Sequence, residues 1–166
     1  MLVIIEGCDG SGKSTLIKQL KSKYDFDESI PKSLPTYKST QTMCGETATA
    51  INLSLYNGKD IILDRGWMSE VIYSSILRRK PSRFNKIHIR MFERMALSTG
   101  VTVVHCNPGR DEILRNLMER GDEHIKDITT LDKIIDAYQD LEQLTCLPIL
   151  EYDYQEHDTE LLGELI

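Results

Sequence analysis

Apolar residues along this chain follow two patterns that alternate with each other. Short apolar runs of strand length lie at residues 2–5, 60–64, 101–106 and 148–151. Longer segments with apolar residues at helical spacing lie at 14–24, 46–57, 69–79, 82–98, 111–120 and 130–144. This alternation predicts a three-layer α/β/α fold with a parallel sheet of about five strands, in a single domain over residues 1–166.

Glycine and proline mark the boundaries of several segments. Gly58 and Gly100 follow two predicted helices at the position where a left-handed residue commonly ends a helix. The segment 25–42 is polar and contains Pro31 and Pro35. It is therefore predicted to form an extended strand or loop along the rim of a site.

Composition and charge narrow the class of protein. The chain has 20 basic and 26 acidic residues, a net charge of −6, which argues against a large duplex-binding surface. The run at 78–83, Arg-Arg-Lys-Pro-Ser-Arg, is the one candidate basic patch, with a solvated helix end as the alternative. No apolar stretch approaches the roughly twenty residues of a membrane span, and the N-terminus lacks the features of a signal peptide. We therefore expect a cytoplasmic protein.

The cysteines show no metal-binding or redox pattern. Cys8, Cys44, Cys106 and Cys146 are widely spaced, and none forms a Cys-x-x-Cys pair. We expect buried or partly buried thiols. Cys8 is the one candidate for a reactive thiol because it lies in a glycine-rich loop.

The most specific motif is the phosphate-binding pattern Gly-x-x-x-x-Gly-Lys-Ser at residues 7–14, between the first apolar run and the first helical segment. Its glycines let successive backbone N–H groups point at phosphate oxygens, at the positive end of the following helix. Lys13 then reaches the β- and γ-phosphates, and Ser14 is a candidate Mg²⁺ ligand. The candidate ATP-binding residues are Gly7, Asp9, Gly10, Ser11, Gly12, Lys13, Ser14 and Thr15.

A second candidate site follows the apolar run at 60–64. Asp64 and Arg65 lie at the carboxyl end of this predicted strand, the edge at which parallel sheets bind ligands. An acid there can hold Mg²⁺, and an arginine can bind a phosphate through two parallel hydrogen bonds. Alternatively, Asp64 caps the next helix and Arg65 lies on the surface. Beside a phosphate loop we favour the functional interpretation.

Together, these motifs resemble the thymidylate kinase-like branch of the P-loop nucleotide kinases. The resembling pieces, in the family's order, are residues 5–15, Leu63-Asp64-Arg65 with Ser69 and Tyr73, residues 115–122, and Tyr138 with Leu141. The resemblance implies a five-stranded sheet with a mobile lid, here at about residues 120–130. It also implies transfer of the γ-phosphoryl group of ATP to a deoxynucleoside monophosphate. The compact length resembles the short kinases of bacteriophages, and kinases of this type are often homodimers.

Position by position, the resemblance assigns roles to single residues. Asp9 would contact the sugar hydroxyl of the acceptor, and Arg65 would bind the acceptor phosphate. Lys13 and Ser14 would hold ATP and Mg²⁺. Asp64 is the second candidate Mg²⁺ ligand because of its place at a strand end, not because of the resemblance. The candidate catalytic residues are thus Asp9, Lys13, Asp64, Arg65, Arg115 and Arg120.

Arg115 and Arg120 supply cations beyond the phosphate loop. Phosphoryl transfer requires the charge on the migrating group to be neutralised from several directions, and the loop itself contributes only Lys13. The helical segment 111–120 carries both arginines just before the polar stretch of the expected lid. The alternative is an amphipathic helix whose arginines form surface salt bridges.

The chain also departs from the family pattern. The spacing from the phosphate loop to Asp64 is shorter than usual, the family's Arg-Glu-Pro-Gly segment is not recognisable, and Glu123-His124 stand where its lid often has Asp-Arg. Base contacts must then come from other aromatic side chains. Candidates for substrate binding, each with simple packing as the alternative, are Tyr37, Trp67 and Tyr73.

Other functional classes fit these motifs less fully. A GTPase would carry Asn-Lys-x-Asp, and the nearest string, at 85–88, lacks the final acid. A kinase acting on a hydroxyl, of a nucleoside or of a modified base such as 5-hydroxymethyluracil in DNA, would use Asp9 or Asp64 as general base. The shortened acceptor region favours this alternative, whereas the negative net charge disfavours DNA as a substrate. A non-catalytic nucleotide-sensing module would not need Asp64, Arg65 and the lid arginines together.

Overall fold

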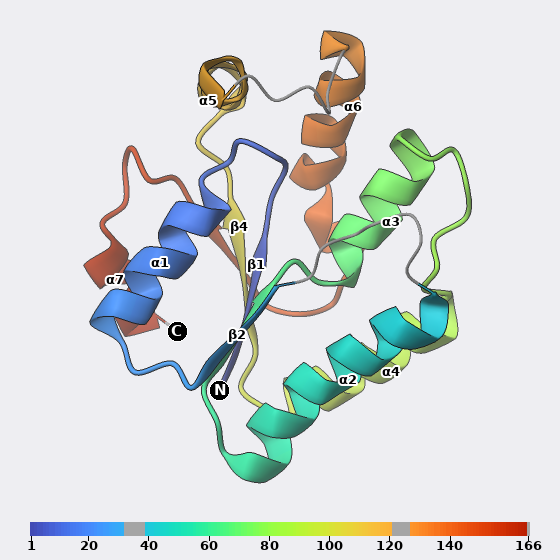
Figure 1. The fold of residues 1–166 in the computed structure, drawn as a ribbon, viewed down its shortest axis with the longest axis vertical. Helices are drawn as coiled ribbons and strands as arrows, with labels where there is room; N and C mark the ends of the chain where they lie inside the picture. The colour runs from blue at the N-terminus through green and yellow to red at the C-terminus, as the bar shows by residue number, and fades with distance from the viewer. Residues whose placement is uncertain (32–38, 121–126, 166) are drawn as a thin grey trace.

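A parallel five-stranded sheet forms the centre of the molecule (Figure 1). The computed structural model describes residues 1–31, 39–120 and 127–165. The strand order is β2-β3-β1-β4-β5, and all four pairings are parallel. The strands are β1 (Leu2–Glu6), β2 (Glu28–Pro31), β3 (Ile61–Asp64), β4 (Thr102–Cys106) and β5 (Ile149–Tyr152). The predicted sheet is thereby confirmed, and β2 is the extended segment expected within residues 25–42.

Helices cover both faces of the sheet, as the alternating pattern predicted (Figure 1). The helices are α1 (Lys13–Lys23), α2 (Thr40–Asn57), α3 (Trp67–Ile76), α4 (Lys86–Leu97), α5 (Arg110–Arg120), α6 (Ile128–Gln139) and α7 (Thr159–Leu165). Within β1, Val3 and Ile5 face the cluster that packs against α1 and α7. Leu2 and Ile4 face the opposite cluster, which includes buried residues of α2, α3, α4 and α6. The burial of β1 on both faces explains its unbroken apolar run.

Local capping explains where helices differ from their predicted bounds. α2 begins at Thr40, six residues before the predicted start at 46, because the Ser39 hydroxyl accepts from the Thr42 N–H at 3.1 Å. It ends at Asn57 and is followed by Gly58, whose φ of 66° is left-handed. α4 begins at Lys86 rather than 82 because Asn85 accepts from the His88 N–H at 2.9 Å and completes a capping box.

Other differences concern the ends of the predicted segments. α3 already ends at Ile76, and the segment predicted at 130–144 divides into α6 and a short 3₁₀ turn over Leu141–Gln143. The sequence pattern did not predict α7. Within the described residues, no helix is long and apolar enough to cross a membrane.

The basic run at 78–83 has a structural role. Glu70, on α3, has an exposed fraction of 0%, and its carboxylate forms ion pairs with Arg78 at 2.6 Å and Arg83 at 2.8 Å. Arg83 also donates to Glu70 through Nε at 2.9 Å and through its backbone N–H at 3.1 Å. These two arginine side chains are largely buried and therefore belong neither to a nucleic-acid patch nor to a solvated helix end, whereas Arg79 and Lys80 of the same run are exposed.

Replacing Glu70 by Gln should lower the free energy of unfolding by about 3 kcal/mol, because two guanidinium groups lose the charge that compensates their burial. Burial alone would raise the pKa of Glu70, but the hydrogen bonds from Arg83 and Arg78 outweigh it and lower the pKa. The charge contribution is therefore present above about pH 4.3 and is lost as the pH falls through the lowered native pKa. Urea unfolding at pH 7 measures the difference. Glu142→Gln, at an exposed position, is the control, and an equal effect of both substitutions would contradict the assignment.

Candidate active site

The phosphate loop joins β1 to α1 through glycines that the local geometry requires. Gly7 has a φ of 142°, and a Cβ there would lie 2.6 Å from Ser11 Oγ and 2.7 Å from the Cys106 carbonyl oxygen. Gly12, with a φ of 90°, precedes α1 and offers no side chain to its first turn. The N–H groups at the start of α1 are therefore available to an anionic ligand.

Lys13 lies almost entirely inside the protein. Its side chain is 7% exposed, and Nζ donates to the Cys8 carbonyl oxygen at 2.6 Å. Burial, reinforced by the nearby charge of Arg65, lowers the pKa of Lys13 to about 8. The ammonium group of Lys13 thus lies next to the loop, but its charged form is less stable there than in water.

A polar pocket of about 220 Å³ lies at the carboxyl edge of the sheet. It is lined by Asp9, Gly10, Gly12, Lys13, Ser14, Asp64 and Arg65. Every one of these residues was predicted as a site residue from the sequence. The structure brings them together because Ile5 of β1 pairs with Asp64 of β3, so both strands end at the same level.

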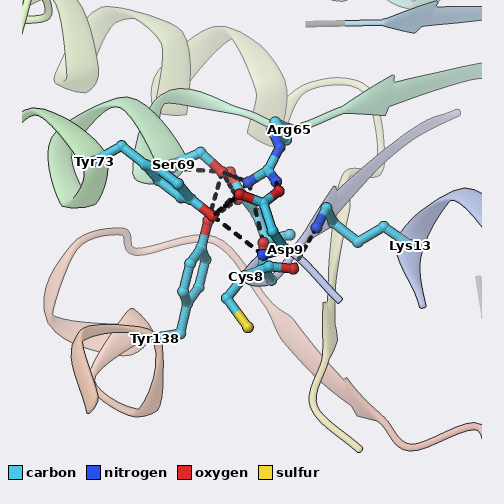
Figure 2. Close-up of polar contacts among 9 residues, drawn as sticks. Cys8, Asp9, Lys13, Arg65, Ser69, Tyr73 and Tyr138 are labelled. Atoms are coloured by element: carbon cyan, nitrogen blue, oxygen red, sulfur yellow. Dashed lines mark hydrogen bonds and ion pairs between the residues drawn. The ribbon is translucent and has the colours of Figure 1, made fainter. Parts of the chain in front are cut away.

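Asp9 and Arg65 form an ion pair at this pocket (Figure 2). The Tyr73 hydroxyl donates to Asp9 Oδ2 at 3.0 Å and lies 3.1 Å from the Asp9 backbone nitrogen, from which it accepts. The Arg65 guanidinium carbon lies 5.1 Å from the centre of the Tyr73 ring. Burial alone would lower the pKa of Arg65, but Tyr138, Tyr73, Asp9 and Glu6 raise it above its ordinary value. Arg65 is therefore a permanent cation.

A buried polar cluster lies directly behind Arg65. Its members Glu6, Ser69 and Tyr138 fall within the resembling pieces of the sequence, but no role was predicted for any of them. Arg65 Nη1 donates to Ser69 Oγ and to the Tyr138 hydroxyl, both at 3.3 Å. Both hydroxyls lie against the carboxylate of Glu6. The ring of His105 stacks on Tyr138, with centroids 5.8 Å apart. The one sequence signal for Glu6 is an acidic residue at the end of an apolar strand, immediately before a phosphate loop.

Of the two expected lid arginines, the described one, Arg115, does not line the pocket. The Arg115 side chain is 63% exposed and pairs with Glu112 on the same helix, which is the surface salt bridge considered as the alternative. α5 instead contacts the loop through Asn116, whose Nδ2 donates to the Gly10 carbonyl oxygen at 2.8 Å. Arg120 is the last residue of α5, and its side chain is not described. Residues 121–126 of the predicted lid lie outside the described residues.

The aromatic candidates have different outcomes. The prediction that Trp67 contacts a base is wrong, because Trp67 is 0% exposed and stacks on Phe92 in the core, with centroids 5.9 Å apart. Tyr73 does lie at the site, where its hydroxyl binds Asp9. Tyr37 lies outside the described residues.

The structure supports the buried-thiol interpretation of Cys8. Cys8 is 3% exposed, and burial raises its pKa to about 11 despite the opposing charge of Lys13. Such a shift favours the neutral thiol over the reactive thiolate. Of the other cysteines, Cys106 is buried, Cys44 is half-buried and Cys146 is exposed.

A larger pocket of about 460 Å³ adjoins the phosphate loop on the side of α7. Gly12 and Thr15 of the loop and α1 form one wall, and Tyr154 and Asp158 lie among the residues opposite. The Gly12 backbone approaches the Tyr154 ring so closely that a Cβ at position 12 would lie 2.9 Å from it. Gly12 lines both pockets, so they adjoin each other at this end of the loop.

Comparison with known proteins shows the fold. No protein-family model matches the chain, and no curated protein sequence matches it significantly. Among solved structures, the YorR protein of Bacillus subtilis in complex with phosphorylated GDP superposes with a TM-score of 0.79, at 19% identity over 99% of this chain and 92% of that chain. Deoxyadenosine kinase from M. mycoides with bound dCTP gives a TM-score of 0.59, at 16% identity over 99% and 96% of the two chains. The chain has a P-loop kinase fold.

The lowered pKa of Lys13 predicts that phosphate binding takes up a proton above pH 8. At pH 9 about nine-tenths of the Lys13 side chains are neutral, but an oligophosphate anion favours the charged form. Binding at this pH should therefore take up about one proton. Above pH 8 the affinity for the anion should fall by up to about tenfold per pH unit. Calorimetry with tripolyphosphate in two buffers of different ionisation enthalpy measures this uptake. Lys13→Arg, which stays charged throughout, should take up none. Equal proton uptake by both proteins would contradict the assignment.

Proposed function

We propose that this protein is an ATP-dependent phosphotransferase that moves the γ-phosphoryl group of ATP to a deoxynucleoside monophosphate, with a dTMP- or dUMP-like or modified pyrimidine nucleotide as acceptor. The observation that carries the proposal is one polar pocket with two cations from different strand ends, Lys13 and Arg65. A donor and an acceptor phosphate need positive groups from different directions if they are to meet in line. This pocket supplies them.

The phosphate loop is the proposed binding site of ATP, the phosphoryl donor. The glycine backbone and the start of α1 would bind the phosphates of ATP, and Lys13 would exchange the Cys8 carbonyl for a phosphate oxygen. The 460 Å³ pocket beside Gly12 and Thr15 has room for the nucleoside of the same molecule.

Mg²⁺ fits the oxygen ligands at the pocket. Ser14 and Asp64 both line it, and oxygen is the ligand atom that Mg²⁺ prefers. In the described part of the chain, no group of three or more His, Cys, Asp or Glu side chains could hold a metal ion. Two protein ligands are nevertheless typical of Mg²⁺ that is held mainly by phosphates and water. When bound, the ion would neutralise charge on the phosphates, while Ser14 and Asp64 keep it at the loop.

The acceptor side follows from the Asp9–Arg65 pair. Arg65 would exchange the carboxylate of Asp9 for the acceptor phosphate, because both are anions of suitable geometry. Asp9 would then be available to a sugar hydroxyl, with Tyr73 beside it. Arg120 and the segment 120–130 are proposed to close over the site as a lid, and Arg115 joins them in this proposal only if its bond with Glu112 breaks.

A kinase that phosphorylates a hydroxyl is the second candidate. The carboxylate of Asp64 lines the pocket and is suited to accept the proton of an attacking hydroxyl. A solved protein with this fold is named as a deoxyadenosine kinase, which acts on a nucleoside. The acceptor would then be a nucleoside or a modified base in DNA. The thymidylate kinase-like specificity, the bacteriophage-like compact form, the homodimer and the cytoplasmic location stay predictions.

An ATP-consumption screen separates these candidates. With Mg²⁺ present, we expect turnover with one of the deoxynucleoside monophosphates, including dTMP, dUMP and 5-hydroxymethyl-dUMP, and none with Lys13→Ala as the blank. Turnover only with nucleosides or modified-base DNA would support the second candidate. Nucleotide binding without any turnover would indicate a sensing module.

Arg65→Ala should lower kcat/KM for a phosphorylated acceptor by about 10- to 100-fold, the equivalent of one or two charge-assisted hydrogen bonds, while ATP affinity changes by less than about twofold. Steady-state kinetics and ATP titration measure the two quantities. Arg90→Ala, on the exposed face of α4, is the matched control and should change neither. An equal loss of acceptor use and ATP affinity would overturn the assigned role.

Asp64→Asn should weaken the Mg²⁺-dependent part of ATP binding by about tenfold, because the amide carries no charge to attract the ion. Titration with Mg²⁺ at fixed ATP measures it without relying on turnover. Asp132→Asn, a carboxylate paired with Arg110 on the surface, is the control. An unchanged Mg²⁺ requirement in Asp64→Asn would exclude Asp64 as a ligand.

A further inference from the structure

The carboxylate of Glu6 is buried behind the candidate site without a role in the proposed reaction. Glu6 is the last residue of β1, directly before the phosphate loop, and its exposed fraction is 0%. A carboxylate in such a place must be compensated by hydrogen-bond donors, because its desolvation is costly. The identity of those donors shows what Glu6 holds in position.

Two of the donors are backbone groups at the start of α3. Glu6 Oε1 accepts from the Gly66 N–H at 2.7 Å and from the Ser69 N–H at 3.4 Å. Gly66 is the N-cap of α3 and has no side chain to satisfy the N–H groups of the first turn. Glu6 performs this capping from the neighbouring strand, with its negative charge at the positive end of the helix.

The close approach of Glu6 depends on the absence of a side chain at Gly66. A Cβ at this position would lie 3.1 Å from Glu6 Oε1 and 3.0 Å from Ile4 Cγ2. Arg65, immediately before, has a φ of 73°, which is strained for a residue other than glycine. Such a conformation persists only where the surroundings fix it. The Arg65 N–H bond to the Ile5 carbonyl, at 3.0 Å, and the Gly66 N–H bond to Glu6 hold both sides of Arg65.

The same carboxylate orients two hydroxyl groups toward Arg65. A carboxylate only accepts, so the Ser69 hydroxyl donates to Glu6 Oε2. The Tyr138 hydroxyl lies 2.7 Å from Ser69 Oγ and 3.5 Å from Glu6 Oε2. Because both protons are directed away from Arg65, both oxygens can accept from its Nη1. Figure 2 shows Arg65, Ser69 and Tyr138 gathered at this point.

We propose that Glu6 is a positioning residue for Arg65. Through the start of α3 and the hydroxyls of Ser69 and Tyr138, its carboxylate helps to set the direction in which Arg65 presents its guanidinium to the pocket. The Gly7 carbonyl oxygen, which accepts from Arg65 Nη1 at 3.1 Å, is a further acceptor that does not depend on Glu6. The consequence for acceptor use rests on the proposed function, whereas the geometric role does not. Glu6 is absent from the pocket lining, and it acts on Arg65 through these intermediates and through its charge.

Glu6→Gln is the sharpest test because it keeps the shape of the side chain. With the amide oxygen facing Gly66 and Ser69 N–H, the amide NH₂ faces the Ser69 hydroxyl, whose proton must then turn toward Tyr138 or Arg65. Glu93→Gln is the matched control. Glu93 is also buried, at 8% exposed, and its carboxylate accepts from Thr145 at 2.8 Å and from the Cys146 N–H at 3.0 Å, but it lies outside the site.

NMR of the ¹⁵N-labelled arginine side chains gives a readout that does not depend on activity. The Arg65 guanidinium signals, assigned by their loss in Arg65→Lys, should shift and broaden in Glu6→Gln and remain as in the wild-type protein in Glu93→Gln. In parallel, kcat/KM for the acceptor should fall about 10- to 100-fold in Glu6→Gln, with KM for ATP within about twofold.

Unchanged Arg65 signals in folded Glu6→Gln would overturn the proposal. If Glu6→Gln does not fold, Ser69→Ala, which removes one hydroxyl acceptor and keeps the backbone cap, is measured in the same way with the same two outcomes. If the wild-type protein turns over no acceptor, the proposed function fails, and the NMR comparison still decides the role of Glu6.

Discussion

The parallel register between β1 and β3 is the constraint on which the site depends. Because Ile5 pairs with Asp64, the two strands end at the same level, and the segments that follow them leave the sheet side by side. Asp9 and Arg65, 56 positions apart, can then form an ion pair. A slip of one residue would exchange the faces of every side chain in β1, so the burial of Val3 and Ile5 on one side and Leu2 and Ile4 on the other fixes this register.

Burial gives the charges at this edge their chemical character. Lys13 and Glu6 are each less than one-tenth exposed, and each is compensated by fixed protein groups: a carbonyl oxygen for Lys13, and N–H and O–H donors for Glu6. In such surroundings, electrostatic interactions are stronger than in water, and unpaired groups are costly. The charged groups at this edge are therefore held in fixed positions by oriented protein dipoles. In the proposed reaction, fixed dipoles of this kind would stabilise the charge of the transferring phosphoryl group.

The parts of this structure that could be predicted from sequence are those encoded locally. The glycine pattern before Lys13 and the apolar run before Asp64 each specify a strand end within a few residues. The cluster of Glu6, Ser69 and Tyr138 joins residues 63 to 132 positions apart, and no periodic pattern marks it. Trp67 was misjudged for a related reason: closeness to the strand end in sequence does not reveal that its ring points into the core against Phe92.

The Asp9–Arg65 pair connects the two candidate reactions through the charge of the acceptor. A phosphorylated acceptor would replace the Asp9 carboxylate as the anion paired with Arg65. Asp9 would then need other hydrogen-bond donors, and the Tyr73 hydroxyl already supplies one. A neutral hydroxyl acceptor offers Arg65 no such replacement. Breaking the pair would leave a permanent, largely buried cation without its anion, which is strongly unfavourable. With a hydroxyl acceptor, Asp9 would therefore stay paired with Arg65, and Asp64 would act as the general base. The charge of the acceptor thus determines which carboxylate would contact it: Asp9 for a phosphorylated acceptor and Asp64 for a neutral hydroxyl.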